Sequence, residues 1–330
     1  MSSIDNIRNR ASERIRKVIF PEAEKDLRVI EAANRIVSEK LLTPVLLGEK
    51  ENVVKLSEEN GVKLDDRIMF ASNRDSESEQ TKYDFFSKKL AHKNPSKEEL
   101  LALCNNPLFT AGWMLATDQA DAAVAGSVAS TGEVIVSALR TVGIASDSNI
   151  VSSSFLMDFP DRRIYTYADC AVVPYPNSEQ LASIAIDAAK THQLLTQQDP
   201  IIAFLSFSTK GSAKHERVDL VKNAVEIAKE KNPGLKMDGE FQFDTAVIPD
   251  IARRKAPGSK IAGNANVFIF PNLDAGNIAY KITERLAGAT ATGPILQGLS
   301  KPYMDLSRGC SVDDIVNTAC VASLLSHNIT

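Results

Sequence analysis

The sequence is poor in the residue types that tie a chain together covalently or through a metal ion. It has four cysteines and four histidines among 330 residues. The cysteines form no C-x-x-C pair and the histidines show no metal-ligand spacing, so neither a disulfide framework nor a metal site is expected. These residues are Cys104, Cys170, Cys310 and Cys320, and His92, His192, His215 and His327. We expect reduced thiols and histidines without a catalytic role.

Long apolar stretches and a strong charge of either sign are also missing. No run of about 18 apolar residues could span a membrane, and residues 1–17 carry both charges where a signal peptide would be apolar. The formal net charge is 38 − 42 = −4, which gives no electrostatic drive toward nucleic acid or acidic lipid. We therefore expect a cytoplasmic protein that binds neither nucleic acid nor membranes.

What the sequence does contain is a regular alternation of strand-like and helix-like segments. Short β-rich runs lie at 17–20, 43–48, 121–126, 200–207 and 266–272, and helical patterns lie at 26–40, 130–143, 178–195 and 216–231. This alternation predicts parallel sheets covered by helices, and the length predicts about two domains. Residues 150–176 instead resemble two strands joined at Pro160–Asp161, which predicts a hairpin in a mixed sheet.

Four loops follow predicted strands and are rich in Gly, Ser, Thr and Asn. They are AGSVAST (125–131), SFSTKGSAK (206–214), FPNLDAGN (270–277) and DLSRGC (305–310). Ligands of open α/β folds bind at this edge, and hydroxyls with free backbone N–H groups suit phosphate, although no P-loop pattern is present. The predicted substrate-binding residues, in these loops or beside them, are Ser127, Ser130, Thr131, Ser206, Ser208, Thr209, Lys210, Asn266, Asn277 and Gln297. Polar loops without a ligand, and helix capping by Ser130 or Thr131, are the structural alternatives.

The stretch DLSRGCSVDD, residues 305–314, carries the densest set of reactive groups. Ser311 and Asp314 fit a capping box that begins a helix. Ser307 and Arg308 precede that helix, where a guanidinium and the helix dipole would both favour an anion. A carboxylate beside that anion could take a proton from an incoming thiol. Cys310 is a rival nucleophile, but a lone intracellular cysteine is more often a small buried apolar group.

With these motifs in this order, the chain resembles the phosphate acetyltransferase (phosphotransacetylase) family nearly from end to end. The resemblance rests on KVIFPEAEKDLRVIEAA, ADAAVAGSVAST, SFSTKGSAK, DGEFQFDTA, GNANVFIFPNLDAGNIAYK, GPILQGLSKP and DLSRGCSVDDI. It implies two three-layer α/β/α domains with a cleft between them, in the isocitrate/isopropylmalate dehydrogenase-like architecture. The first domain would comprise residues 1–144 plus 296–330, and the second, an insertion, residues 145–295.

The resemblance also implies an activity within acetate metabolism, the reversible reaction of acetyl-CoA and phosphate to acetyl phosphate and coenzyme A. Coenzyme A, acetyl phosphate and inorganic phosphate would be substrates, no cofactor would be tightly bound, and the chain would form a homodimer. The family's catalytic Ser, phosphate-binding Arg and base fall on Ser307, Arg308 and Asp314. The CoA thiolate would attack acetyl phosphate directly in a ternary complex, with Asp314 taking the thiol proton.

Two family arginines associated with CoA are missing here, because their positions fall on Leu90 or Ala91 and on Val136. A Lys lacks the planar fork of Arg, so a substitute would hold phosphate less specifically. The nearby candidates are Lys88, Lys89, Lys93 and Arg140. Alternatives to acetyl transfer are propionyl or butyryl transfer, a non-catalytic CoA- or anion-binding relative, and a dehydrogenase on the related scaffold, for which no cluster of metal-binding aspartates is evident.

Overall fold

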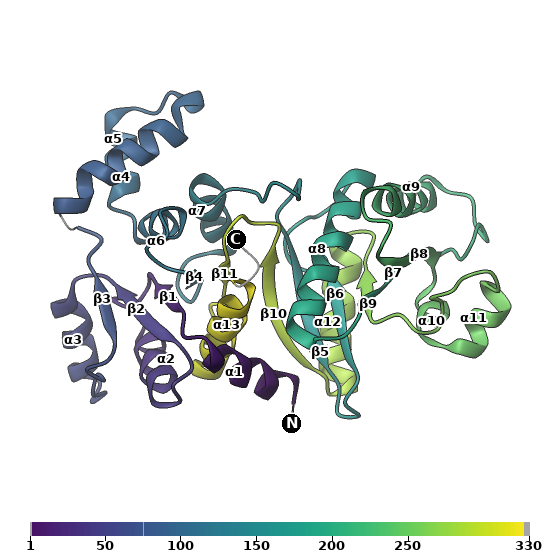
Figure 1. Ribbon diagram of the computed structural model, residues 1–330, viewed down its shortest axis with the longest axis horizontal. Helices are drawn as coiled ribbons and strands as arrows, with labels where there is room; N and C mark the ends of the chain where they lie inside the picture. The colour runs from purple at the N-terminus through teal and green to yellow at the C-terminus, as the bar shows by residue number, and fades with distance from the viewer. Residues whose placement is uncertain (1, 75, 327–330) are drawn as a thin grey trace. The chain divides into compact units, whose positions relative to one another are not determined.

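Both ends of the chain contribute to one sheet, and the middle of the chain forms another. The computed structural model describes residues 2–74 and 76–326, so His327, for which no role was expected, lies outside the described residues. One unit comprises residues 3–145 together with the chain from 299 onward, and the other comprises residues 146–298 (Figure 1). The chain crosses between the units at 145/146 and 298/299, next to the crossings predicted at 144/145 and 295/296.

The sheet of the first unit is parallel throughout, with the strand order β11–β4–β1–β2–β3. Its strands are β1 (Lys17–Phe20), β2 (Thr43–Leu47), β3 (Met69–Ala71), β4 (Ala122–Ala125) and β11 (Tyr303–Asp305). The central strands are apolar and buried on both faces, as a parallel sheet covered by helices requires. The β-rich runs predicted at 17–20, 43–48 and 121–126 are thereby confirmed.

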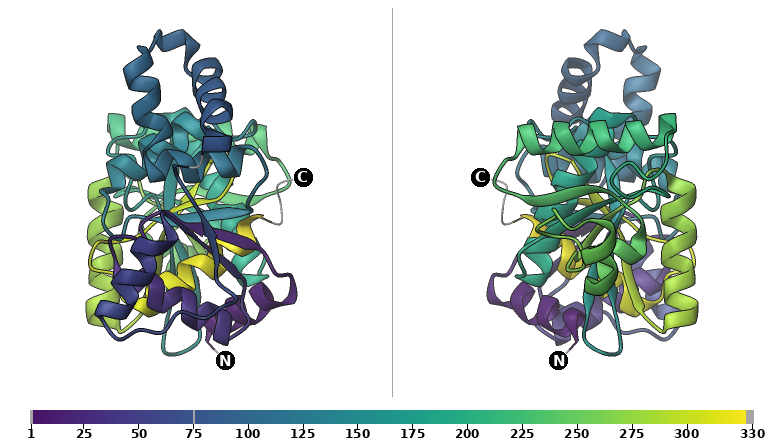
Figure 2. Two further views of the ribbon diagram at one scale, coloured as in Figure 1. Left: turned by 90° about the vertical axis from the view of Figure 1, so that its left-hand side faces the viewer. Right: turned by 90° about the vertical axis from the view of Figure 1, so that its right-hand side faces the viewer.

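Helices cover both faces of this sheet (Figure 2). α1 (Ser3–Glu13), α2 (Leu27–Ser38) and α13 (Val312–Leu325) pack together on one face, and α6 (Pro107–Ala116) and α7 (Thr131–Thr141) cover the other. α3 (Lys50–Glu59) packs on α2, whereas α4 (Ser76–Lys89), the short 3₁₀ helix η1 (Ala91–Lys93) and α5 (Lys97–Cys104) form a projecting group. α2 begins where the side chain of Asp26 accepts the backbone N–H of Arg28, which confirms the helix predicted from residue 26.

The sheet of the second unit is mixed, with the order β10–β5–β6–β9–β7–β8. Its strands are β5 (Ser152–Asp158), β6 (Ile164–Ala168), β7 (Ile201–Leu205), β8 (Lys236–Phe241), β9 (Val267–Ile269) and β10 (Thr290–Gln297). β5 pairs antiparallel with β6 and with β10, and the other pairs are parallel, so the predicted hairpin in a mixed sheet is confirmed. β7 and β9, the two apolar runs predicted to be buried on both faces, pair with each other at the centre.

Two helical layers enclose this second sheet. α8 (Ser178–Thr196) and α9 (Glu216–Lys231) cover one face, and α10 (Phe243–Val247), α11 (Pro249–Lys255) and α12 (Leu273–Ala287) lie on the other. Each unit is thus a three-layer α/β/α arrangement, which confirms the predicted fold class. No helix within residues 2–74 and 76–326 is long and apolar enough to cross a membrane.

Three neighbouring strands of the first unit end at one edge of their sheet. β11, β4 and β1 are adjacent and parallel, so their carboxyl ends lead into loops that meet there. These loops are residues 306–311, 126–130 and 21–26, and the first two hold most of the motifs DLSRGC (305–310) and AGSVAST (125–131). The fold therefore gathers the predicted catalytic stretch and one predicted anion loop at a single edge.

Candidate active site

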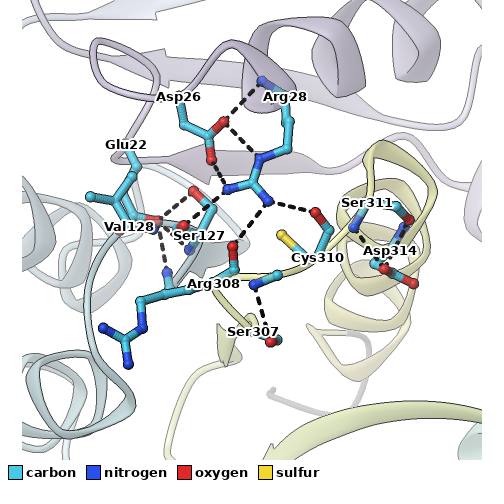
Figure 3. Close-up of polar contacts among 12 residues, drawn as sticks. Glu22, Asp26, Arg28, Ser127, Val128, Ser307, Arg308, Cys310, Ser311 and Asp314 are labelled. Atoms are coloured by element: carbon cyan, nitrogen blue, oxygen red, sulfur yellow. Dashed lines mark hydrogen bonds and ion pairs between the residues drawn. The ribbon is translucent and has the colours of Figure 1, made fainter.

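A buried glutamate fixes the loop that follows β4. The carboxylate of Glu22, in the loop after β1, accepts the four backbone N–H groups of residues 126–129 at 2.6–3.2 Å. It also accepts the hydroxyl of Ser127 at 3.0 Å, and both side chains are buried (Figure 3). The N–H groups that the sequence offered to phosphate are therefore occupied by an internal carboxylate. This corrects the prediction that Ser127 and its loop present free donors to a substrate.

Two further carboxylates play the same part in the second unit. Glu240, in β8, accepts the backbone N–H of Gly211 and the hydroxyl of Ser208, each at 2.8 Å. Asp169, directly after β6, accepts the N–H groups of residues 171–173 at 2.7–3.2 Å and both the N–H and the hydroxyl of Ser153. Because both carboxylates are almost fully buried, these loops satisfy their donors internally rather than with a ligand.

The remaining predicted residues of the SFSTKGSAK loop also have partners within their own unit. The ammonium of Lys210 contacts Asp238 at 2.6 Å and the carbonyl of Gly239 at 2.7 Å. Thr209 is buried, and its Oγ1 accepts a backbone N–H at 2.9 Å. The hydroxyl oxygen of Ser206 accepts the N–H of residue 208 at 3.2 Å. These contacts engage Ser208, Thr209 and Lys210 within their own unit, and substrate binding by these residues stays a prediction.

The two hydroxyl residues at the start of α7 have structural partners. Ser130 is the N-cap of α7 and forms a capping box with Glu133, which confirms the capping alternative. Thr131 donates its hydroxyl to Oδ2 of Asp305 at 2.7 Å and so ties α7 to the end of β11. Both residues lie at the edge of the sheet that carries DLSRGC, but each hydroxyl is committed to a carboxylate.

Three predicted amide residues have structural roles in the second unit. Asn266 lies at the amino end of β9, opposite the ligand edge, where its side chain accepts the N–H of Ile201 and donates to the carbonyl of Asp199. Gln297 is buried and donates to Ser152 and to the carbonyl of Ile184. These contacts favour a structural role for Asn266 and Gln297, and substrate binding by either residue stays a prediction. The side-chain amide of Asn277, on α12, donates to the carbonyl of Cys170 at 3.0 Å and so fastens α12 to the end of β6.

The loop after β11 differs because two of its residues, Ser307 and Arg308, keep donors that are not taken. The side chains of Ser307 and Arg308 are exposed. Within the described residues, no acceptor lies within hydrogen-bond distance of their backbone N–H groups, and the guanidinium of Arg308 forms no ion pair. The hydroxyl oxygen of Ser307 accepts the N–H of Gly309 at 3.3 Å, which leaves its own proton free to be donated. This loop combines a free cation, a free hydroxyl and two free N–H groups, as an anion site requires.

Asp314 caps the helix that follows this loop. Its Oδ2 accepts the N–H and the hydroxyl of Ser311, each at 2.8 Å, and Ser311 in turn accepts the N–H of Asp314, so the predicted capping box is confirmed. The carboxylate is exposed, and no described residue donates to its Oδ1. No hydrogen bond joins Asp314, on α13, to Ser307 or Arg308 in the loop, and the three side chains lie apart from one another (Figure 3).

The thiol of Cys310 lies just beneath the same loop. Only 6% of the residue is exposed, and desolvation raises the pKa of the thiol although the charge of Arg28 opposes that rise. A buried thiol with a raised pKa supplies little thiolate. The structure therefore favours the reading of Cys310 as a buried apolar group over that of a nucleophile. Among the described residues, no group of three His, Cys, Asp or Glu side chains could hold a metal ion.

Two functional contacts were missed from the sequence. Arg28, assigned only to a helix, pairs with Asp26 and also reaches the carbonyls of Arg308 and Cys310. Glu22 was not singled out although it organises the neighbouring loop. Both belong to the quoted motif KVIFPEAEKDLRVIEAA, whose cluster of charges directly after a buried strand was the available signal.

Comparison with known proteins identifies the family. A family model described as phosphate acetyl/butaryl transferase matches residues 2–323. The chain belongs to this family. It is 40% identical over 337 residues to a phosphate acetyltransferase of Acetivibrio thermocellus, covering 100% of this chain and 99% of that relative. The corresponding protein of Bacillus subtilis is 41% identical over 313 residues, covering 93% of this chain and 94% of the relative.

Solved structures agree with this assignment to the phosphate acetyl/butaryl transferase family. The crystal structure of a phosphotransacetylase from Streptococcus pyogenes is 37% identical, covers 98% of each chain and gives a TM-score of 0.93. The resemblance stated from the motifs is therefore confirmed, as is the prediction of a transferase with this fold.

Asp305 is a buried acid at the end of β11, directly before the loop that holds Ser307 and Arg308. It is 2% exposed, its Oδ2 accepts the hydroxyl of Thr131, and within the described residues its Oδ1 has no partner. Desolvation, with a smaller contribution from the negative charge of Glu22, raises the pKa of this carboxyl to about 6. A carboxyl with a raised folded-state pKa favours folding while it is protonated. Its contribution to the free energy of unfolding is fully present below the unfolded-state pKa of about 4. That contribution is lost as the pH rises through the folded-state pKa of about 6.

We expect the substitution Asp305→Asn to stabilise the protein more at pH 8 than at pH 5. Asn keeps an oxygen for Thr131 and carries no charge to desolvate. The difference in unfolding free energy between variant and parent should grow by about 1 kcal/mol between these pH values, measured by urea denaturation. The exposed Asp66→Asn is the control for the chemical change from Asp to Asn. An equal effect of Asp305→Asn at both pH values would contradict the assignment.

Proposed function

We propose that this chain catalyses the reversible transfer of an acetyl group between coenzyme A and inorganic phosphate. Acetyl-CoA and phosphate would give acetyl phosphate and CoA. The observation that carries the proposal is the loop after β11, where Ser307 and Arg308 keep their donors free. In two of the other predicted anion loops, those after β4 and β7, internal carboxylates accept the donors. Membership of the phosphate acetyl/butaryl transferase family supplies the reaction class.

In the proposed mechanism, the acetyl group passes directly from phosphate to sulfur in a ternary complex. The CoA thiol loses its proton to Asp314, and the thiolate attacks the carbonyl carbon of acetyl phosphate. Ser307 donates its hydrogen bond to the oxyanion that forms, and the C–O bond to phosphate then breaks. Arg308 holds the departing phosphate, whose charge is greatest at that moment.

The position of Asp314 is compatible with the role of general base. Its Oδ2 is fixed by the capping box, while Oδ1 accepts no hydrogen bond from a described residue and the side chain is exposed. The cap therefore orients the carboxylate without using both of its oxygens. A base held in this way is pre-oriented at little entropic cost, which favours proton transfer to a bound thiol.

Basic residues near α4 and α7 are our candidates for the phosphates of CoA, which binds as a substrate rather than as a tightly held cofactor. At the positions of the missing arginines, Leu90 is buried, and Ala91 and Val136 are exposed and uncharged. Four nearby cations form no ion pair within the described residues, and three of them are exposed: Lys88, Lys89, Lys93 and the half-buried Arg140. Unpaired cations are free to attract a polyanion.

The exposed face of α12 is our candidate for a homodimer interface. Ile278, Ile282 and Leu286 follow one another at four-residue spacing and are 57%, 52% and 83% exposed. Exposed Lys281 and Arg285 and the half-buried Glu284 border this stripe with both signs of charge. Such a stripe can pack against its own copy around a two-fold axis, as isologous dimers do.

We expect the protein to form acetyl-CoA from acetyl phosphate and CoA, followed by thioester absorbance. Because Arg308 supplies the guanidinium for phosphate, Arg308→Ala should raise the KM for acetyl phosphate and lower kcat, for a combined loss in kcat/KM of about 100-fold. Propionyl and butyryl phosphates should react more slowly than acetyl phosphate. An unchanged KM and kcat in Arg308→Ala would rule out its assigned role.

Asp314→Asn should lower kcat by about 100-fold because it removes the proton acceptor. The matched control is Asn177→Ala, which weakens the capping box of α8 by about 1 kcal/mol and leaves Asp314 and its partners unchanged. Melting temperature and kcat should be measured for both variants. If Asp314→Asn lowers only the melting temperature, as Asn177→Ala should, Asp314 is a capping residue and not the base.

Ile282→Glu should convert the dimer to a monomer, because a charge would be buried at the centre of the α12 interface. Size-exclusion chromatography with light scattering would report the mass of each species. Ile144→Glu, at an exposed apolar position outside α12, is the control and should leave the mass unchanged. A monomeric parent protein, or a variant that stays dimeric, would contradict this interface.

A further inference from the structure

The guanidinium of Arg28 uses all three of its nitrogens. Nε and Nη2 donate to the two carboxylate oxygens of Asp26 at 3.0 and 2.7 Å. Nη2 also donates to the carbonyl of Ser127 at 3.1 Å. Nη1 donates to the carbonyls of Arg308 and Cys310 at 3.1 and 2.6 Å (Figure 3). One side chain of α2 thus fastens the loop after β4 to the loop after β11.

The same Asp-x-Arg fork occurs at two other places, without these carbonyl contacts. Arg67 grips Asp65 through Nε and Nη2 at 2.8 and 2.7 Å, and its backbone N–H also binds that carboxylate. Arg163 grips Asp161 in a similar way. Both of these arginine side chains are 58% exposed, against 33% for Arg28. The Asp-x-Arg fork by itself therefore does not distinguish Arg28 from Arg67 and Arg163. The contacts of Arg28 with the carbonyls of the loop after β11 do.

The carbonyl contacts determine where the loop's hydrogen-bond donors point. In a trans peptide, the C=O of one residue and the N–H of the next point in opposite directions. Since Arg28 holds the carbonyl of Arg308, the N–H of Gly309 is directed away from Arg28 and donates to the hydroxyl oxygen of Ser307. That bond occupies an acceptor position of the hydroxyl and leaves its proton for another partner.

The charges around Arg28 also favour anion binding at the loop after β11. Asp26 is 8% exposed and neutralises Arg28, whose pKa is raised chiefly by the hydrogen bonds to Asp26, so the pair is no competing anion site. The carbonyl oxygens of Arg308 and Cys310 carry partial negative charge, and an anion at this loop would be repelled if they faced it. Held against Arg28, they are turned toward a cation instead.

We propose that Arg28 is a positioning residue for the transfer reaction, which fixes the peptide groups of residues 308–310 so that Ser307 and Arg308 face the acyl phosphate. Arg28 itself touches no substrate. The inference rests on the proposed function and adds to it a residue that acts through backbone carbonyls. Displacing such a loop by about 1 Å is enough to cost about 100-fold in rate.

The test compares Arg28→Ala with Arg67→Ala, which removes the same type of fork elsewhere in the same unit. Arg28→Ala should lower kcat for acetyl-CoA formation by about 100-fold with a smaller change in KM. Free guanidinium, well below denaturing concentrations, should restore part of the kcat. Arg28→Lys should remain impaired, because an ammonium lacks the fork that spans Asp26 and the carbonyls. Arg67→Ala should keep the parental kcat.

Hydrogen exchange of the full chain provides a measurement that needs no activity. The amides of residues 309–311 should exchange faster in Arg28→Ala than in the parent, and at the parental rate in Arg67→Ala. Unchanged exchange in Arg28→Ala would overturn the proposal, as would faster exchange with parental kcat. If exchange rises throughout the chain in Arg28→Ala and guanidinium does not restore kcat, the proposal fails, and Arg28 only stabilises the fold in general. If the parent protein makes no acetyl-CoA, the proposed function fails, while the exchange result still shows whether Arg28 holds the loop.

Discussion

Buried carboxylates that satisfy backbone N–H groups at the carboxyl ends of strands are the constraint on which the site depends. Glu22, Asp169 and Glu240 each lie at such an end. Each accepts hydrogen bonds from backbone N–H groups of a loop that forms no β-sheet hydrogen bonds there. A buried N–H left without an acceptor costs about 1–3 kcal/mol, so each carboxylate removes several such penalties at once. The loops are thereby set in one conformation before any ligand arrives, at the edge where ligands of this fold class bind.

This arrangement also decides where an anion can bind. Gly- and Ser-rich loops at strand ends attract phosphate only while their N–H groups are free, and an internal carboxylate competes for the same donors. Around β11, β4 and β1, Glu22 takes the donors of residues 126–129, whereas the donors of Ser307 and Arg308 remain unpaired within the described residues. Arg28 contributes as well, because it binds carbonyl oxygens of the loop after β11 and so turns them away from the position of an anion.

Local sequence patterns were enough to predict the helices and strands. They did not predict which groups accept the hydrogen bonds of the loops. Strand 17–20, the hairpin at Pro160–Asp161 and the capping box of Ser311 depend on neighbours within a few residues, so they could be predicted. Glu22 lies 104 residues before the first N–H that it binds, and Arg28 lies 280 residues before the carbonyl of Arg308. A loop that holds an internal carboxylate has the same Gly and Ser content as one that holds phosphate. The sequence therefore could not show that internal carboxylates accept the donors of Ser127 and Ser208.

The two acids and the thiol near Ser307 in the fold differ in their exposure to solvent and in their hydrogen bonds. Asp305 is buried at the end of β11, where its carboxyl, with a pKa of about 6, ties α7 to β11. Asp314 is exposed, and within the described residues its Oδ1 accepts no hydrogen bond. The thiol of Cys310 is buried, and desolvation raises its pKa, so an acyl-enzyme on Cys310 would need a nucleophile that its surroundings suppress. The environment of Cys310 thus favours the proposed direct transfer to CoA over an acyl-enzyme on this thiol.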